Sequence, residues 1–354
     1  MFLKIKNKIE AELINYARQS EQLYSLHKVS GILFKHIKNF ILREGKRIRP
    51  ILFIAGYRGF CNRTPQGFYR SAISLELLHD FMLIHDDVID KSKTRRGKPS
   101  MHTMLASYLS KSKGAKFSGE DLSIVIGDII YAMSLQAFLS INEKYEAKEK
   151  ALRILTDAAM RTGSGEFIEL LAGLKSIGRI NKNDIYKIYD LKTAYYTFSA
   201  PLIMGATLAG AGKKEIKKLY DYGIHLGRAF QIKDDILDMF GDEKETGKST
   251  LTDLKEAKKT LLIWYAYKKA SRKQKIFIKK IMSRENPNKP DLEKIRVITE
   301  ETGALDYCKN EISASIKKAK KTISSSTIKP QYKEMLRSYS EEILELGWLF
   351  APTL

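Results

Sequence analysis

The same acidic pattern occurs twice in this chain, with the two copies starting 148 positions apart (86 and 234). Each copy places three carboxylates at positions i, i+1 and i+4 of an apolar run: Asp86, Asp87 and Asp90 in the first, and Asp234, Asp235 and Asp238 in the second. On a helix, residues i and i+4 share a face and residue i+1 flanks it. Unpaired carboxylates are costly among apolar side chains, and Mg²⁺ takes oxygen ligands and bridges carboxylates to substrate phosphates. Two such triads facing each other would form a site for a metal–diphosphate group.

Basic residues lie at intervals that suit this chemistry. They are Lys46 and Arg49 between two predicted helices, Arg95 and Arg96 after the first triad, Lys192 beside Thr193 in a predicted helix, and Lys248 after the second triad. Arginine binds phosphate through two parallel hydrogen bonds, and lysine supplies a compact charge. Any one of these cations alone is typical of a solvated surface, so their order around the two triads is what indicates a diphosphate site.

Further residues share a helical face with the triads. His79 and Met82 lie seven and four residues before Asp86, and Gln231 lies one turn before Asp235. These spacings predict that they line the same cavity as the carboxylates.

The composition limits the class of protein. The chain of 354 residues is 44% hydrophobic and 29% charged, as is typical of a globular protein with a substantial core. Its net charge of +21 favours anionic partners such as nucleic acid, acidic lipid or phosphorylated small molecules, although a lysine-rich solvated surface accounts for most of it. The two cysteines, Cys61 and Cys308, form no disulfide framework or metal-binding spacing, which predicts a cytoplasmic location.

No signal peptide or transmembrane span is expected. Residues 1–20 lack the long apolar core of a signal peptide and have the pattern of an amphipathic helix. The most apolar window, residues 122–141, is long enough to cross a bilayer, but Gly127 and Asp128 interrupt it near its middle. We therefore expect a buried central helix there.

Helical periodicity runs through most of the chain, and the sequence contains no run of alternating strands. The predicted helices span residues 4–18, 23–42, 48–60, 66–91, 101–109, 121–142, 145–161, 164–173, 181–209, 213–240, 252–270, 272–283, 291–302, 303–324 and 330–347. Loops are predicted at residues 93–99, 111–120, 241–250 and 283–290, where Gly, Pro, Ser and Asn gather. Because no low-complexity linker separates two halves, we predict a single all-α domain over residues 1–354.

Together these motifs resemble the trans-isoprenyl diphosphate synthases, also called polyprenyl synthetases. GKRIRP (45–50) is similar to the first basic motif of that family, residues 77–97 to its first Asp-rich motif, and residues 230–248 to its second. The pairs Gly127-Asp128 and Lys192-Thr193 also match, so that the motif-bearing core runs from about residue 40 to about residue 265. The resemblance implies an isoprenoid-synthase bundle of roughly 12–15 helices around a central apolar cavity.

Two positions depart from the family pattern. Glu44 stands where a Gly is usual, which can change the flexibility of the loop before Lys46. Asp80, beside His79, is a polar residue that the motif does not require.

The resemblance also implies an activity, a prenyltransferase that joins isopentenyl diphosphate head to tail to an allylic diphosphate (C5, C10 or C15). It assigns Asp86, Asp87, Asp90, Asp234 and Asp238 to three Mg²⁺ ions, with Asp235 in support. It assigns Arg95, Lys192 and Lys248 to the allylic diphosphate, and Lys46, Arg49, His79 and Arg96 to isopentenyl diphosphate. Thr193 and Gln231 would stabilise the allylic carbocation or orient their neighbours, and Lys258 matches a further basic position near the mouth of the site.

The length of the product is predicted from the residues before the first triad. Phe81 and Met82 lie five and four positions before Asp86, and on an ideal helix Met82 is directly beneath it. An aromatic residue five positions before the motif resembles short-chain geranylgeranyl diphosphate synthases of the archaeal kind. We therefore predict a C20 product, with farnesyl (C15) or C25 diphosphate as alternatives and ordinary helix packing as the alternative role of Phe81.

Several other classes were weighed. Terpene cyclases and the head-to-head squalene and phytoene synthases have different second motifs, and a non-catalytic partner subunit would lack triad or basic residues that are all present here. A nucleic-acid binder would need clustered cations with exposed aromatics, whereas runs such as residues 272–280 and 316–321 are typical of solvated helix faces. The family resemblance implies a homodimer, and a weak peripheral contact of the basic surface with anionic lipid stays open.

Overall fold

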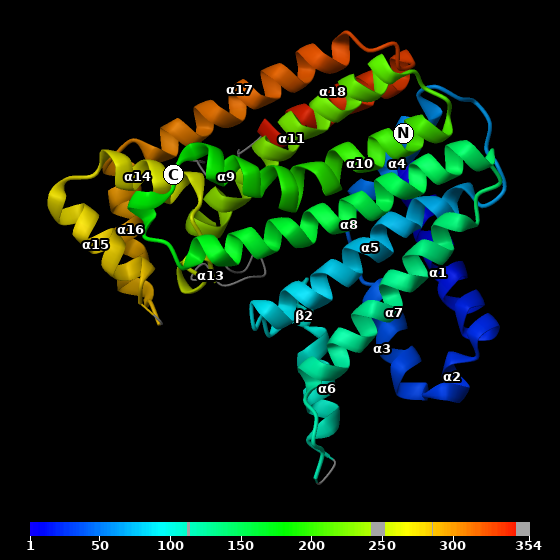
Figure 1. The fold of residues 1–354 in the computed structure, drawn as a ribbon, viewed down its shortest axis with the longest axis horizontal. Coiled ribbons are helices and arrows are strands. Elements are labelled where there is room, and N and C mark those ends of the chain that lie inside the picture. The colour runs from blue at the N-terminus through cyan, green and yellow to red at the C-terminus, as the bar shows by residue number, and fades with distance from the viewer. Residues whose placement is uncertain (112–113, 242–251, 285, 345–354) are drawn as a thin grey trace, which may run out of the picture. The chain divides into compact units, whose positions relative to one another are not determined.

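The computed structural model describes residues 1–111, 114–241, 252–284 and 286–344. Nearly all of these residues lie in helices joined by short turns, as Figure 1 shows. The strands of the described chain are two-residue segments, β1 (Thr94–Arg95) and β2 (Lys98–Pro99), which pair as an antiparallel hairpin. The predicted all-α class is confirmed. The chain divides into two compact units, unit 1 (Met1–Leu155 and Pro201–Ala211) and unit 2 (the other described residues). The predicted single domain stays a prediction.

Unit 1 is built around the pairing of α5 with α7. Its helices are α1 (Phe2–Tyr24), α2 (Leu26–Val29), α3 (Gly31–Ile41), α4 (Ile48–Arg58), α5 (Phe68–Ile89), α6 (Met101–Leu109), α7 (Gly119–Leu139), the first part of α8 (Tyr145–Gly173) and most of α10 (Ala200–Leu208). The Ser134 hydroxyl of α7 donates to the Ser74 carbonyl of α5 at 2.8 Å, and the Ser71 hydroxyl donates to the Phe138 carbonyl at 2.5 Å. Small hydroxyl residues therefore let the two helices pack closely while their buried polar atoms are satisfied.

Unit 2 is built around α11. Its elements are the second part of α8, η1 (Ile177–Arg179), α9 (Lys182–Tyr189), η2 (Asp190–Ser199), α11 (Lys213–Phe240), α13 (Thr252–Lys255), α14 (Leu261–Lys269), α15 (Arg272–Met282), α16 (Lys289–Glu301), α17 (Ala304–Ser324) and α18 (Pro330–Leu344). In Figure 1, α17 and α18 lie along α11. The Tyr222 hydroxyl of α11 donates to the Leu336 carbonyl of α18 at 2.8 Å, and Arg296 of α16 donates to the Met239 carbonyl at 2.7 Å. These contacts fix both ends of the helix that carries the second triad.

The starts of four helices are set by local chemistry. Reciprocal side-chain and backbone hydrogen bonds form capping boxes at Ser118 (α7), Asn181 (α9), Ser271 (α15) and Asn288 (α16). Each box satisfies amide groups that the first turn of a helix cannot pair internally.

Several predicted boundaries were wrong. The helices expected at residues 23–42 and 252–270 are each divided in the structure. The helices expected at residues 145–161 and 164–173 are one continuous helix, α8, because the glycines near residue 164 do not interrupt its hydrogen bonds. The single helix expected at residues 181–209 is α9, η2 and α10 in succession, and η2 has wider π-type turns. The predicted loop at residues 93–99 contains the β1–β2 hairpin.

One described helix, α7, has the length and composition of a membrane span. Of its apolar window, 44% is buried within the protein. Its exposed face carries Ile124, Val125 and Leu139. The helix is therefore partly a core helix, as expected, and partly an apolar surface.

Candidate active site

The first triad lies at the C-terminal end of α5. The backbone N–H of Asp90 donates to the Asp86 carbonyl at 2.8 Å, so these two residues stand one turn apart on one face of the helix. Both side chains are half-buried, whereas Asp87 is fully buried. Since the C-terminal end of a helix carries partial negative charge, three carboxylates there require nearby cations.

Asp87 has its own cation. Arg95 of β1 donates from Nε to Asp87 Oδ1 at 2.8 Å. Burial raises the pKa of the Asp87 carboxyl, and the Arg95 guanidinium opposes that rise. The pKa of Arg95 is also raised, because the attraction of the Asp87 carboxylate outweighs the effect of burial. Arg43 supports the hairpin by donating to the Pro99 carbonyl at 2.9 Å. Arg95, assigned from the sequence to the allylic diphosphate, is thus held against Asp87.

A group of cations surrounds His79. The His79 side chain is half-buried, and burial together with the positive charges of Arg49 and Arg96 holds its pKa well below the usual value. Its imidazole is therefore neutral at pH 7 and has one N–H to donate. Lys46 is exposed in the loop before α4. The structure thus places Arg49 and Arg96 near His79, and their assignment to one diphosphate stays a prediction.

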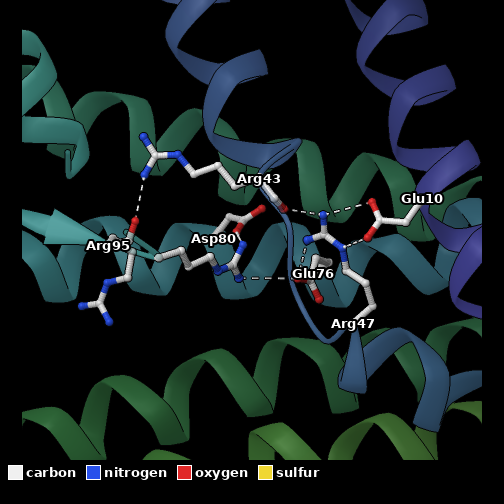
Figure 2. Close-up of polar contacts among 7 residues, drawn as sticks. Glu10, Arg43, Arg47, Glu76, Asp80 and Arg95 are labelled. Atoms are coloured by element: carbon white, nitrogen blue, oxygen red, sulfur yellow. Dashed lines mark hydrogen bonds and ion pairs between the residues drawn. The ribbon is translucent and has the colours of Figure 1, made fainter. Parts of the chain in front are cut away.

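Beneath this group lies a buried ionic network (Figure 2). Arg47 is fully buried, donating from Nε to Glu10 at 2.8 Å and from Nη1 to Glu76 at 2.7 Å. Its Nη2 donates to the Arg43 carbonyl at 2.6 Å. Three elements are joined in this way, α1, the loop before α4 and α5. The network also holds Arg47 in a left-handed conformation (φ 54°) at the start of α4.

Arg96 faces the same network. Its guanidinium lies 3.6 Å from Glu76 and 3.8 Å from Asp80. Asp80 is fully buried, and neither of its oxygens has a described hydrogen-bond partner. Burial, followed by the charge of Glu76, raises the pKa of the Asp80 carboxyl well above its usual value. The residue that departs from the family motif is therefore placed where it acts on Arg96.

The second triad lies near the C-terminal end of α11 and divides in the same way. Asp234 and Asp238 are half-buried, whereas Asp235 is 5% exposed. Asp235 accepts hydrogen bonds from the Tyr189 hydroxyl and, at 2.9 Å, from Gln231 Nε2. In both triads the i+1 carboxylate is held inside the protein, and the i and i+4 carboxylates occupy the partly exposed face.

Thr193 and Gln231 belong to one hydrogen-bonded chain. The Thr193 hydroxyl donates to Gln231 Oε1 at 2.6 Å, and the same Gln231 amide donates onward to Asp235. At the far end, the Leu261 amide donates to the Tyr189 hydroxyl at 2.9 Å. The chain sets the orientation of the Gln231 amide and links η2, α11 and α14.

Lys192 is carried by the π-type element η2. Its ammonium pairs with two carboxylates of α8, Glu169 at 2.5 Å and Glu166. The π-type turns, which are common at functional sites, lie against α11. A Cβ added to Gly227 would lie 2.3 Å from the Cα of Ala194, so only glycine permits this approach.

The remaining predicted residues are placed as follows. The Phe81 ring packs edge-on against His85 at 4.7 Å and against Tyr131 of α7 at 5.1 Å between ring centroids. Met82 is half-buried. Lys258 pairs with Glu256 at 2.7 Å. Lys248 lies outside the described residues.

The donor chemistry of both triads fits Mg²⁺. Asp86 with Asp90, and Asp234 with Asp238, offer hard carboxylate oxygens one turn apart on partly exposed helix faces. Among the described residues, no three acidic, His or Cys side chains converge as a complete metal site. Mg²⁺ usually binds through one or two carboxylates, water and substrate phosphates.

Sequence reasoning missed the residues that hold the predicted ones in place. They are Arg47 and Glu76 in unit 1, and Glu166, Glu169 and Tyr189 in unit 2. Glu76 could have been found, because it lies three residues before His79 on the same helical face. The partners of Lys192 lie more than 20 positions away, and no local pattern marks them.

Comparison with known proteins decides the family. The model of the polyprenyl synthetase family matches residues 31–299. The chain belongs to the polyprenyl synthetase family. Among its relatives, the geranylfarnesyl diphosphate synthase of Aeropyrum pernix is 30% identical over 317 residues, covering 87% of this chain and 92% of the relative. The geranylgeranyl diphosphate synthase of Saccharolobus solfataricus is 29% identical over 292 residues, covering 77% and 82%.

Solved structures of this family agree. A geranylgeranyl pyrophosphate synthase from Corynebacterium glutamicum, crystallised with isoprenyl diphosphate and magnesium, superimposes with a TM-score of 0.86. It is 26% identical, and the match covers 97% of this chain and 98% of that one. The predicted family and enzyme class, a prenyltransferase that makes isoprenyl diphosphates, are confirmed.

Proposed function

We propose that this polyprenyl synthetase joins isopentenyl diphosphate head to tail to an allylic diphosphate in a Mg²⁺-dependent reaction, with geranylgeranyl diphosphate (C20) as its product. The observation that carries the proposal is the matched division of the two triads, in which Asp87 and Asp235 are buried with partners of their own. The carboxylates at i and i+4 lie on the partly exposed faces of the two helices, where they would bind metal. Two copies of one arrangement on unrelated stretches of sequence are not expected of carboxylates that serve only solubility.

The carboxylates would hold the metal ions of the allylic diphosphate. Asp86, Asp90, Asp234 and Asp238 supply the oxygens, and Mg²⁺, in three ions, would neutralise the charge that develops on the leaving diphosphate. Asp87 and Asp235 orient the two helix ends through Arg95 and Tyr189. Both assignments rest on the chemistry of the donors and on the family.

Lys192 and the cations near Asp87 would bind the leaving group. Glu166 and Glu169 fix the position of the Lys192 ammonium before any substrate arrives, and their charges also reduce its attraction for a diphosphate, as Glu76 and Asp80 do for Arg96. A cation fixed in this way stabilises charge that appears in the transition state without reorganising. Lys248, in the second motif, and Lys258 are assigned to the same task.

Isopentenyl diphosphate would bind to the cations around His79. Arg49 and Lys46 supply positive charge, and neutral His79 supplies an N–H donor. Arg96 contributes a weaker attraction, because Glu76 and Asp80 already lie 3.6 and 3.8 Å from its guanidinium. Holding two charged substrates side by side removes much of the entropic cost of their reaction.

The carbon–carbon bond forms after the allylic C–O bond ionises. The double bond of isopentenyl diphosphate attacks the allylic cation, and a proton is then lost to the released diphosphate. The Thr193 hydroxyl and the Gln231 amide, oriented by their hydrogen-bonded chain, are the polar groups assigned to the cation. Apolar walls must exclude water from it.

The product length would be limited by Phe81. Its ring is braced by Tyr131 and His85, which makes it a stiffer barrier than Met82 alone. Named relatives make C20 and C25 products, so C15 and C25 remain the alternatives.

The enzyme would act as a homodimer. Exposed apolar side chains form a stripe on α7 (Ile124, Val125 and Leu139) and another on α8 (Met160, Phe167 and Leu171). Apolar stripes of this kind mark contact with a second copy. Light scattering after gel filtration should give twice the mass of 40.5 kDa, and Phe167→Lys should lower it.

The proposal is tested by product analysis. The pure protein is incubated with Mg²⁺, labelled isopentenyl diphosphate and each of the C5, C10 and C15 allylic diphosphates, and the alcohols are sized after dephosphorylation. Elongation that stops at C20 supports the proposal in full, and a stop at C15 or C25 corrects the product. A folded sample that elongates no primer would favour a non-catalytic partner subunit.

A further inference from the structure

Unit 2 carries a long stretch of chain that is basic and free of acidic residues. Residues 257–284, which form α14 and α15 (yellow in Figure 1), contain ten Lys and Arg residues and no Asp or Glu. Of these ten, Lys258 and Arg284 form ion pairs with carboxylates of the described chain. The longer helix α17 differs, because it mixes its lysines with Asp306 and Glu311. This segment of 28 residues therefore has a net charge of +10, in a chain whose net charge is +21.

Helix α15 has an apolar side that is buried and an outer side that is basic. Its buried side is apolar, with Ile278, Ile281 and Met282 packed inside. Its outer side shows Ile276, which is 61% exposed, with cations one turn before it and one turn after it: Arg272, Lys273, Lys279 and Lys280. Cations that surround an exposed aliphatic side chain can bind anionic headgroups while that side chain enters the acyl boundary.

A second basic surface is a hollow lined in part by α14, the helix that precedes α15 in the chain. It has a volume of about 580 Å³, and three lysines line it, Lys182, Lys268 and Lys269, together with one carboxylate, Asp184. Its aromatic rings are Trp264 and a stacked pair, Tyr265 and Tyr307, whose centroids lie 3.9 Å apart. Lysines beside partly buried Trp and Tyr rings are typical of protein surfaces that lie in the headgroup layer of a membrane.

We propose that the outer face of α15, with Ile276 at its centre, and the Lys268–Lys269 hollow form a docking surface for anionic phospholipid. The lysines attract the headgroups, Ile276 enters the acyl boundary, and the hollow receives a headgroup phosphate. This inference goes beyond the proposed condensation and does not depend on it. If the proposed condensation also holds, an enzyme docked in this way would release its long apolar product close to the apolar interior of the bilayer.

Nucleic acid fits this surface less well. The exposed centre of α15 is aliphatic, whereas single-stranded RNA is held by aromatic rings with a free face. Tyr265 and Tyr307 are stacked on each other, and Trp264 Nε1 donates to the Ile180 carbonyl at 3.0 Å, so that these rings are already engaged.

The experiment is vesicle sedimentation with the full-length protein. Vesicles of phosphatidylglycerol mixed with phosphatidylcholine are compared with pure phosphatidylcholine vesicles at low and high salt. The test variant is Lys273→Gln with Lys280→Gln, and the matched control is Lys317→Gln with Lys321→Gln on α17, where both lysines are exposed and the net charge changes equally. Ile276→Ser is a third variant that alters no charge.

We expect salt-sensitive binding to the anionic vesicles alone. The test pair should bind about 30-fold more weakly, from the usual attraction per lysine near an anionic surface, and the control pair should bind nearly as the parent does. Ile276→Ser should also weaken binding, with circular dichroism and elongation of soluble substrates unchanged. Equal losses in both pairs, no binding to anionic vesicles, or retention of a single-stranded RNA oligonucleotide in place of vesicles would overturn the proposal.

Discussion

Asp235 and Asp238 lie three residues apart on α11, and the same substitution should mainly lower stability at Asp235 and mainly lower activity at Asp238. Asp235 is buried, with Tyr189 donating to one oxygen and Gln231 to the other. Asp238 is half-buried on the face assigned to metal. The two variants, Asp235→Asn and Asp238→Asn, keep the size of the side chain and remove one charge.

The magnitudes follow from the hydrogen bonds. An asparagine at 235 keeps one oxygen acceptor and replaces the other with an NH₂ group. Either the Tyr189 hydroxyl or the Gln231 amide, both of which donate to Asp235, then loses its acceptor. The loss should lower the free energy of unfolding by about 1–3 kcal/mol. Its effect on kcat acts through the position of the helix end and should be about tenfold. Asparagine at 238 should change the free energy of unfolding less. It would remove a carboxylate that we assign to the charge-stabilising metal, with an expected loss of about 10²–10³-fold in kcat.

Urea unfolding followed by circular dichroism gives the stabilities, and incorporation of labelled isopentenyl diphosphate gives kcat. The metal dependence should separate the variants as well, since Asp238→Asn should need more Mg²⁺ for half-maximal rate and Asp235→Asn should not. If Asp235→Asn were as stable as the parent yet as inactive as Asp238→Asn, the division of the triad into an inner and an outer set would be refuted.

Three further outcomes are expected. Phe81→Ala should lengthen the product by one or more C5 units, because it removes the ring that Tyr131 braces as the proposed barrier to elongation. An unchanged product would show that Phe81 is not the barrier. Asp80→Asn should be more stable than the parent at alkaline pH, since the raised pKa of Asp80 means that its ionised form destabilises the fold. The gap should close as the pH falls through that raised pKa, where the parent takes up a proton, and a gap that widens on acidification would contradict the reasoning. Lys192→Met should lower kcat about 10²–10³-fold with little change in KM, measured by steady-state elongation, and an unchanged kcat would remove Lys192 from the site.

Local sequence predicted the elements that carry the triads because their signals are local. The predicted helix at residues 213–240 matches α11 at both ends, and the predicted helix at residues 66–91 differs from α5 by two residues at each end. Long periodic segments with clear boundaries need little tertiary information. The i, i+1, i+4 spacing likewise predicted which carboxylates share a face.

The supporting contacts were beyond the reach of local patterns. Arg47 pairs with Glu10 and Glu76, which lie 37 and 29 positions away in the sequence. Lys192 pairs with carboxylates of another helix, α8. The π-type turns of η2 were also not predicted from the sequence. The sequence alone shows that Asp80 departs from the family motif, but its contact with Arg96 is seen only in the folded chain.

The most direct test of the central claim is a Mg²⁺ titration of elongation by the chelator-treated protein. Labelled isopentenyl diphosphate and a C15 allylic diphosphate are supplied, and prenyl product is measured against free Mg²⁺, beside a sample in which Asp86 and Asp90 are both changed to Asn. The account predicts no product in chelator, full recovery on adding Mg²⁺, and no recovery by the folded double variant at any Mg²⁺ concentration. Product formed in chelator, or by the double variant at the rate of the parent, would contradict it.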